Sequence, residues 1–596
     1  MEQKTMTGFD AVFQVMEEWG MDHIYGYPGG SFDSGMNALY NQQDEMKFIR
    51  VAHEEAGALA AAAEAKLTGK IAACFGSAGP GAVHLLNGLY DAKEDHVPVL
   101  AIVAQVPRKM MNRNFFQAMD EKPIFEDVAV WNRTAMVEET LPDVIDEAIR
   151  QAIKYRGVAV VTIPKDLGWN KGAEVQTRAN AQVEPAYALP DSVKVYQAYA
   201  MIKQAHAPMI YFGMGAKEAG RELQAVSEKF KLPLVSSLLA KGIIADNYPA
   251  YMGVSGRAGS KPASELGFEA DLILWIGNDA PFSLSLLNPH AKVIQVDIDT
   301  EKFGKRHRAD LSFFADAKAF LQELLKKGTD LVPTPFYQAA LNNKQDWEQW
   351  LAGFNNRTDL PLRAEPIFAA LSEYAAENAL FTVDVGNVNI NFQRLLKMKA
   401  QQKWTMSGIY GTMGYAVPAS LGAAAAFPDH EIYSLSGDGA YAMMSQEILT
   451  QVKYGLHVIN LVFSNQTLGY IEAEQRDDTD QPIYGTEVLA TNWAMIAQGM
   501  GAHGQTVTTK AEFESALRDA KNYSGPTVID IKMTTEMPFT TQHMFLDPAQ
   551  SSPAQISSFK QRYEAQALKP FKFYLEKMGH VFEQDVVTSA SKNKRS

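Results

Sequence analysis

Residues 431–465 read EIYSLSGDGAYAMMSQEILTQVKYGLHVINLVFSN and carry the pattern on which the fold prediction rests. One apolar run ends in Gly437-Asp438-Gly439, and a second ends in Ser464-Asn465, 25 residues after the triplet. Short apolar, β-branched runs separated by an amphipathic segment are typical of a parallel strand, helix and strand. We therefore expect the two polar ends to contribute to one site.

The residue types at these two ends are those that bind a diphosphate and its metal ion. Glycines at a strand-to-helix turn allow backbone amides to approach a phosphate, and a helix starting near Tyr441 presents its positive end to the anion. Oxygen ligands of the kind that Mg²⁺ prefers are available here. The sequence predicts phosphate contacts at Gly437, Gly439 and Ala440, and metal ligands at Asp438, Asn465 and Thr467. A triplet of this kind on its own is about as often a simple turn.

The same alternation recurs in two earlier stretches of the chain. Runs such as MIYFG, DLILWIGN and KVIQVDID predict buried parallel strands, and an alanine-rich helix is expected from Glu54 to Gly69. The fold class is therefore α/β, with three doubly wound parallel-sheet domains and a C-terminal helical tail. The polar connectors 170–191 and 328–361 separate the domains, which gives the limits 1–180, 190–345, 360–540 and 541–596.

The length and net charge of the chain exclude a single-core domain and argue against some classes of ligand. The 596 residues exceed what one hydrophobic core accommodates. A net charge of -14 argues against nucleic acid and anionic membranes as partners, so an anionic ligand needs a local positive site. A lone cysteine, Cys74, and the lack of an apolar N-terminal stretch predict a cytoplasmic protein without disulfides.

The triplet GDG followed by Asn465 resembles the cofactor motif of thiamin-diphosphate-dependent enzymes. That motif has two asparagines where this chain has Ser464-Asn465, and the second normally binds the metal. The segment HEEAGALAAAAEAK resembles the family's activating helix, which gives Glu54 the role of hydrogen-bonding the cofactor's pyrimidine, with Glu55 as the rival. The resemblance also implies cofactor contacts at Gly29 in YGYPGGS, and a catalytic role for His84 after the turn GSAGPG.

Two more segments match the family in order along the chain. Gly386 and Asn387 in VDVGNVN stand where relatives contact the cofactor from a strand end. Met413 in GTMGYAVPASLGAA resembles the bulky apolar residue that wedges the cofactor into its bent form. The alternative for Met413 is a core methionine that fills a gap.

The middle domain resembles that of the FAD-containing, phosphate-dependent pyruvate oxidases of lactic acid bacteria. The matching segments imply flavin contacts, although each charged residue taken alone is more often a surface charge. The residues concerned are Gly213, Gly215, Lys241, Arg257, Asn278, Asp297, Asp299 and Asp316.

The resemblance implies an enzyme that binds thiamin diphosphate, Mg²⁺ and FAD. It would convert pyruvate, phosphate and O2 to acetyl phosphate, CO2 and H2O2 through a hydroxyethyl intermediate. Substrate or phosphate would contact Phe116, Gln117, Tyr470 and Glu474. In such enzymes the cofactor lies between two subunits, so we expect a homo-oligomer, a tetramer in the first instance, in which residues 54 and 438 meet across chains.

Three alternatives remain open at this stage. Acetolactate synthases use the same cofactors, but Glu474 stands where they carry a tryptophan. A quinone-linked pyruvate oxidase would need a C-terminal amphipathic helix that binds the membrane surface through an apolar face. This chain ends instead in the polar sequence VTSASKNKRS. A non-catalytic relative would have no reason to retain Glu54, Asp438 and Asn465 together.

Overall fold

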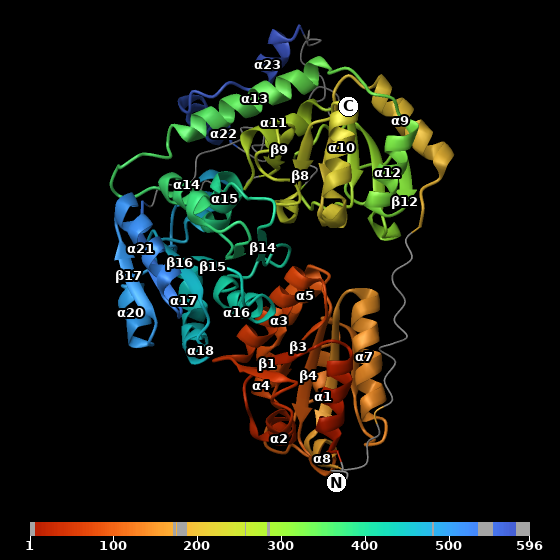
Figure 1. Cartoon of the computed structure of the whole chain (residues 1–596), viewed down its shortest axis with the longest axis vertical. Coiled ribbons are helices and arrows are strands. Elements are labelled where there is room, and N and C mark those ends of the chain that lie inside the picture. The colour runs from red at the N-terminus through yellow and green to blue at the C-terminus, as the bar shows by residue number, and fades with distance from the viewer. Residues whose placement is uncertain are drawn as a thin grey trace.

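The computed structural model describes residues 6–170, 175, 188–256, 258–282, 286–478, 482–534 and 552–579. Within these ranges the chain forms three six-stranded sheets whose strands pair in parallel. Helices cover both faces of each sheet, and each sheet forms a separate body (Figure 1). The predicted α/β architecture of three doubly wound domains is confirmed.

The first sheet has the strand order β2-β1-β3-β4-β6-β5. Its strands are β1 (His23–Gly26), β2 (Lys47–Arg50), β3 (Ala72–Gly76), β4 (Val99–Gln105), β5 (Ala129–Thr134) and β6 (Val158–Pro164). Its helices are α1 (Gly8–Glu18), α2 (Asp33–Asn41), α3 (Glu54–Thr68), α4 (Pro80–His84), α5 (Leu86–Glu94), α6 (Glu121–Ile124), α7 (Leu141–Tyr155) and α8 (Lys165–Trp169).

Strand β4 shows how the sequence determines this layering. Successive side chains of a strand point to opposite faces, so a strand between two helix layers is apolar throughout. Leu100 and Ile102 belong to the core beneath α1 and α7, whereas Ala101 and Val103 belong to the core beneath α3 and α5. Helix α3 ends at Gly69, whose φ of 73° is left-handed, as the sequence predicts.

The middle sheet has the order β12-β11-β10-β7-β8-β9. Its strands are β7 (Pro208–Phe212), β8 (Leu234–Ser236), β9 (Tyr251–Val254), β10 (Leu272–Ile276), β11 (Lys292–Asp297) and β12 (Leu311–Phe314). Helices α9 (Ser192–Gln204), α10 (Gly220–Phe230) and α12 (Ala317–Lys327) cover one face. The other face is covered by α11 (Lys261–Glu269), α13 (Pro335–Ala352) and α23 (Phe571–Lys577).

The second connector is partly helical, and the predicted helical C-terminal tail is confirmed. Helix α13 occupies 18 residues of the second polar connector and packs through Phe336 and Ala340, so that segment is more than a linker. The C-terminal tail contributes α22 (Pro553–Ala565) and α23, and α23 buries Phe571 and Leu575 on the middle domain.

The third sheet has the order β14-β13-β15-β16-β18-β17. Its strands are β13 (Leu380–Val383), β14 (Lys403–Met406), β15 (Ile432–Gly437), β16 (Val458–Ser464), β17 (His503–Val507) and β18 (Thr527–Lys532). Its helices are α14 (Ala364–Tyr374), α15 (Asn387–Leu395), α16 (Ala416–Ala426), α17 (Asp438–Met444), α18 (Ile448–Lys453), α19 (Gly469–Ala473), α20 (Trp493–Gly499) and α21 (Lys510–Asn522). Among the helices described, none has the length and apolarity needed to span a bilayer.

Candidate active site

Each of the three sheets reverses its winding between two neighbouring strands. In the first sheet the reversal lies between β1 and β3, in the middle sheet between β7 and β10, and in the third between β13 and β15. Ligands of open parallel sheets bind in the crevice at the carboxyl ends of such a strand pair. The predicted glycine turns follow these strands, with Gly29 after β1, Gly213 after β7, and Gly386 after β13.

The diphosphate motif lies at the reversal of the third sheet. Gly437 is the N-cap of α17, which starts at Asp438, three residues earlier than the sequence predicts. A Cβ atom added to Gly437 or Gly386 would meet no atom within 4 Å, so both turns leave room beside the backbone. Gly386 has a φ of 96°, a conformation that favours glycine.

Asp438, Asn465 and Thr467 all line one cavity at this turn. Asp438 is 3% exposed, and its carboxylate accepts the amides of Gly439 (2.9 Å) and Gln466 (2.7 Å). Burial raises the pKa of Asp438. Oδ1 of Asn465 accepts the Thr467 amide at 3.3 Å, and the Thr467 hydroxyl donates to Glu472 at 2.9 Å. Fixed carboxylate and amide oxygens fit a hard cation such as Mg²⁺.

The serine that departs from the family motif has a separate structural role. Ser464 is the last residue of β16, and its hydroxyl donates to Oδ1 of buried Asp530 on β18 at 2.6 Å. Asn465 follows the end of the strand, and its Oδ1 accepts the Thr467 amide instead. The serine that departs from the motif is therefore bonded to β18, and the oxygens predicted to bind the metal belong to other residues.

Asp384 is a buried residue that the sequence analysis missed. Its carboxylate accepts the amides of Tyr415 (2.9 Å) and Ala416 (3.3 Å) and the hydroxyl of Ser436 (2.8 Å). It thereby joins the turn before Gly386, the segment that carries Met413, and the residue before Gly437. Its position directly before the VGN turn is the only signal in the sequence.

We expect Asp384→Asn to destabilise the third domain by about 2 kcal/mol, because an amide NH2 would face backbone donors. Burial raises the pKa of Asp384 to about 6. Because the folded protein binds this proton more tightly than the unfolded chain does, the protonated Asp384 contributes its full stability below about pH 4. This contribution is lost as the pH rises through about 6, and the variant should lack this pH dependence. Calorimetry across this range measures both effects. A variant with the parental pH profile would contradict the assignment.

The middle-domain residues surround the carboxyl ends of β7, β10 and β11. A Cβ atom on Gly213 would lie 2.5 Å from the Gly277 carbonyl oxygen, and one on Gly215 would lie 2.6 Å from Gly277 Cα, so glycine is required where these loops meet. Asp299 and Asp316 cap helices through the amides of Glu301 and Ala319.

The other predicted middle-domain residues differ in whether their polar groups already have partners within the chain. Nζ of Lys241 is buried and bonded to Asp246 at 2.8 Å, so its ammonium group is already paired. Oδ1 of Asp297 accepts the Asp299 amide at 3.0 Å, and burial raises the pKa of Asp297. Arg257 lies outside the described residues.

One cavity of about 2880 Å³ joins the diphosphate turn to the middle domain. Its lining includes most of the predicted residues of both, namely Gly215, Lys241, Asn278, Asp297, Asp299, Asp316, Gly386, Asn387, Met413, Gly437, Asp438, Gly439, Ala440, Asn465, Thr467, Tyr470 and Glu474. Met413 reaches the motif, because a Cβ atom on Gly439 would lie 3.6 Å from Met413 Cε.

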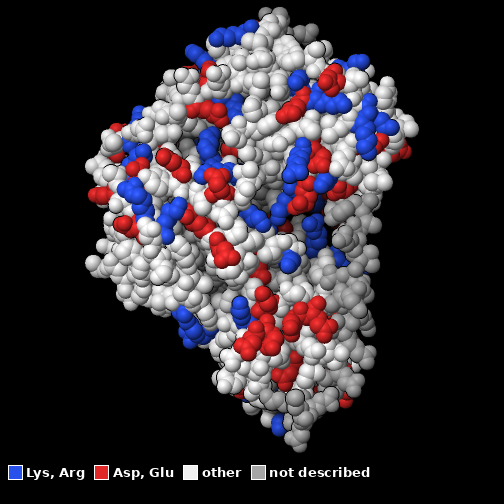
Figure 2. Space-filling view, viewed as in Figure 1, with Lys and Arg blue, Asp and Glu red and all other residues white. Residues whose placement is uncertain are grey.

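The cavity is also rich in cations for an acidic protein. Lys217, Lys302 and Lys403 line it, and nearby Lys403 and Arg156 help burial to lower the pKa of Lys217. Lys and Arg gather around the hollow between the lower and upper lobes, whereas Asp and Glu dominate the visible face of the lower lobe (Figure 2). This is the local positive site that an anionic cofactor requires.

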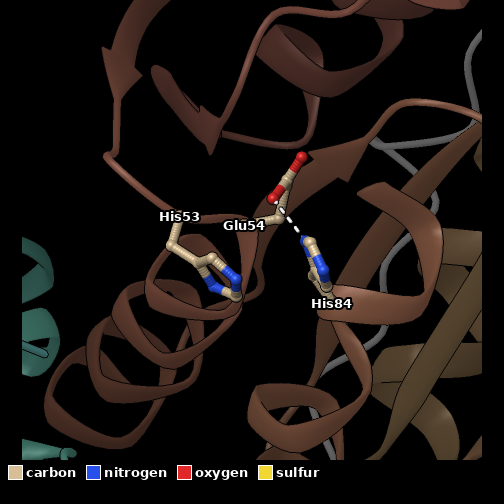
Figure 3. Close-up of side chains that lie close together, drawn as sticks. All are labelled: His53, Glu54 and His84. Atoms are coloured by element: carbon tan, nitrogen blue, oxygen red, sulfur yellow. Dashed lines mark hydrogen bonds and ion pairs between the residues drawn. The ribbon is translucent and has the colours of Figure 1, made fainter. Parts of the chain in front are cut away.

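A second cluster forms at the carboxyl ends of β1 and β3. Glu54 opens α3, is 9% exposed, and its Oε2 lies 2.9 Å from His84 Nδ1 (Figure 3). A Cβ atom on Gly81 would lie 2.9 Å from Glu54 Oε1, and one on Gly29 would lie 2.4 Å from Ser77 Cβ. The sequence therefore brings Gly29, Glu54 and His84 together as predicted.

His53 belongs to this cluster and was not predicted. Its ring stacks on that of His84 with centroids 4.4 Å apart and planes at 28°. Nδ1 of His53 accepts the Glu55 amide at 3.3 Å. One ligand atom from each of His53, Glu54 and His84 lies within 4.8 Å of the other two, a spacing that is compatible with a bound metal ion.

The predicted substrate residues divide between the two clusters. Gln117, with a φ of 61°, lies beside the Gly79 turn, since a Cβ atom on Gly79 would lie 3.0 Å from its carbonyl oxygen. Phe116 is 77% exposed. Tyr470 and Glu474 line the cavity, whereas Glu54, His84, Phe116 and Gln117 are not part of its lining. The two halves of the predicted site are therefore separate within one chain.

Comparison with known proteins agrees with this geometry. Three family models match in order: "Thiamine pyrophosphate enzyme, N-terminal TPP binding domain" over residues 6–124, its central domain over 195–324, and its C-terminal TPP binding domain over 384–531. A "Pyruvate oxidase" of Lactiplantibacillus plantarum is 42% identical over 96% of this chain and 95% of its own.

Two further relatives match over most of their length. A "Putative thiamine pyrophosphate-containing protein YdaP" of Bacillus subtilis is 36% identical over 94% of this chain and 98% of its own. The "Acetolactate synthase isozyme 1 large subunit" of Escherichia coli is 28% identical over 90% of this chain and 95% of its own. Together with the sheet reversals and the buried Asp438 site, these matches show that the chain belongs to the thiamin-diphosphate-dependent enzymes.

Proposed function

We propose that the protein is a pyruvate oxidase that uses thiamin diphosphate, Mg²⁺ and FAD to convert pyruvate, phosphate and O2 to acetyl phosphate, CO2 and H2O2. The observation that carries this proposal is the shared cavity, which reaches from the Asp438 turn to the carboxyl ends of the middle sheet. A thiamin cofactor and a flavin would be neighbours there. The 42% identity to a pyruvate oxidase supports the same activity.

The residues of the chain divide the work at such a site. Asp438 and Asn465 would hold Mg²⁺ through side-chain oxygens, with Thr467 contributing its main-chain carbonyl because its hydroxyl is bonded to Glu472. Met413, whose Cε lies 3.6 Å from a Cβ atom added to Gly439, would support the thiamin in its bent form. When bound, thiamin diphosphate supplies an electron sink for decarboxylation and FAD accepts an electron pair.

Glu54 would hydrogen-bond the pyrimidine ring and hold the proton that the cofactor must exchange. Its low exposure excludes bulk water from this contact. Because Glu54 does not line the cavity that contains Asp438, we propose that a second copy of the chain completes each site. The protein would then be at least a homodimer, and we propose a tetramer built from two such dimers.

Substrate would lie between residues of both chains. Tyr470 and Glu474 line the cavity, and Gln117 and Phe116 of the other copy would close it. Glu474 stands where acetolactate synthases carry a tryptophan that helps to seat the second oxo acid, which argues against an oxo acid as second substrate. Acetolactate synthesis is the second candidate, since relatives with that name are 26–29% identical to this chain.

Anaerobic mixing with pyruvate, thiamin diphosphate and Mg²⁺ tests the proposal. We expect the flavin absorbance to bleach, to recover when air is admitted, and to yield acetyl phosphate only when phosphate is present. Accumulation of acetolactate with an unbleached flavin would instead establish the carboligase. Protein that takes up no flavin would refute the assignment of the middle domain.

A further inference from the structure

The loop that leads into Glu54 is held by a carboxylate of the third domain. Glu447 is fully buried, and its carboxylate accepts the amide of Ala52 at 3.0 and 3.1 Å and the amide of His53 at 3.1 Å. Its Oε2 also accepts the Thr450 hydroxyl at 2.7 Å. The catalytic role proposed for Glu54 makes no use of this contact.

Residues 51–53 form the loop between β2 and α3. The amides of Ala52 and His53 have no partner in either element, so the position of the loop depends on their bonds to Glu447. The amide of Val51 makes a sheet-like bond to Gly26, and α3 begins at Glu54. Backbone donors at a helix start have no partner within the helix, and a buried donor without a partner is costly. Glu447 supplies the acceptor for two of these donors.

Tyr454, which follows α18 in the third domain, holds β2, the strand that precedes this loop. The hydroxyl of Tyr454 accepts the Arg50 amide at 2.7 Å and donates to the Phe48 carbonyl at 3.1 Å. Glu447 and Tyr454 flank α18, so one short stretch of the third domain fixes the chain from β2 to the start of α3.

The same stretch begins at the metal-binding turn. Helix α17 starts at Asp438, and the 3-10 turn Ser445–Glu447 follows it without a gap. Glu447 is the last residue of that turn. Tyr441 of α17 is buried in the core with Ile448. A displacement of the turn at Asp438 therefore moves Glu447 and the loop that it holds, because no flexible linker separates them.

We propose that Glu447 is a positioning residue that couples occupancy of the diphosphate and metal site to the orientation of Glu54 in the same chain. The inference rests on the proposed function, in which these two residues serve different active sites. Binding at one site would thus order the activating residue of the other. The coupling is mechanical and uses two amide hydrogen bonds.

Hydrogen–deuterium exchange with magnesium and inorganic diphosphate tests the coupling. This probe lacks the pyrimidine, so it cannot contact Glu54 directly. We expect it to slow exchange in residues 438–446 and also in residues 50–56 of the full-length protein. In Glu447→Ala the first effect should persist, whereas exchange of Ala52 and His53 should become about 10-fold or more faster and no longer respond to the probe.

Two further variants control for loss of structure. Glu447→Gln keeps the side-chain shape and one acceptor oxygen, so it should give an intermediate response even if the alanine variant does not fold. Glu431→Ala removes a carboxylate that accepts the Ala376 amide at 3.0 Å in the same domain, and it should leave both responses intact. In the coupled model Glu447→Ala also lowers kcat about 10-fold at unchanged pyruvate KM.

The outcomes separate the coupling from the function on which it rests. Protection of 438–446 without any response of 50–56 in the wild type, or a normal response in Glu447→Ala, would overturn the coupling and leave the cofactor site standing. If neither magnesium diphosphate nor thiamin diphosphate protects 438–446, the site itself is misassigned and the coupling falls with it.

Discussion

Replacing Glu54 with glutamine is expected to slow pyruvate-dependent flavin reduction by about 10²- to 10⁴-fold while the protein stays folded and retains its flavin. Glutamine preserves the shape of the side chain and can still bond to His84, which lies 2.9 Å from the carboxylate. It cannot hold or release the proton at the pyrimidine. Stopped-flow absorbance under anaerobic conditions measures the rate directly.

Glu55 provides a matched control one residue away. It occupies the same first turn of α3, and its Oε1 accepts a hydrogen bond from the Asn87 amide at 2.5 Å. Glu55→Gln should change the rate less than about 3-fold, because its carboxylate has a structural partner and no proton to transfer. Equal losses in the two variants would mean a general effect on α3, and a normal rate in Glu54→Gln would refute the central assignment.

Local sequence signals were sufficient for the fold and for the position of the turn at Gly437. Apolar runs that end in glycine identify buried parallel strands, and the carboxyl ends of such strands are where sheets of this class bind ligands. The turn at Gly437 follows from this rule, whereas those at Gly29 and Gly386 came from the resemblance to the thiamin-diphosphate family. Their grouping at three sheet reversals required strand orders, which a single sequence does not contain.

Residues whose partners lie far away along the chain could not be identified from the sequence. Glu447 and Asp384 contact partners 394 and 31 residues away along the chain, and neither stands in a pattern of its own. Lys241 was predicted from a matching segment, but its buried bond to the Gln393 carbonyl, 152 residues away along the chain, was not. The start of α17 was placed too late because glycine residues disfavour helices except at their ends.

Substituting the neighbours Asn465 and Ser464 should have opposite consequences. Asn465→Ala is expected to weaken magnesium-dependent binding of thiamin diphosphate by about 100-fold, because it deletes one of the oxygens that we propose as metal ligands in the cavity that Asp438 also lines. Ser464→Ala should leave this affinity within about 2-fold. A titration of each variant with thiamin diphosphate at fixed Mg²⁺ measures the difference.

The serine variant should lose stability rather than affinity. Its hydroxyl donates to buried Asp530, which also accepts the Trp493 amide at 3.0 Å and pairs with Lys532 at 2.8 Å. Losing one of three partners is expected to cost about 1–2 kcal/mol of unfolding free energy. If Ser464→Ala weakens cofactor binding as much as Asn465→Ala does, then Ser464 contributes to cofactor binding and its role is not limited to stability. The departure from the family motif would then lie within the metal site.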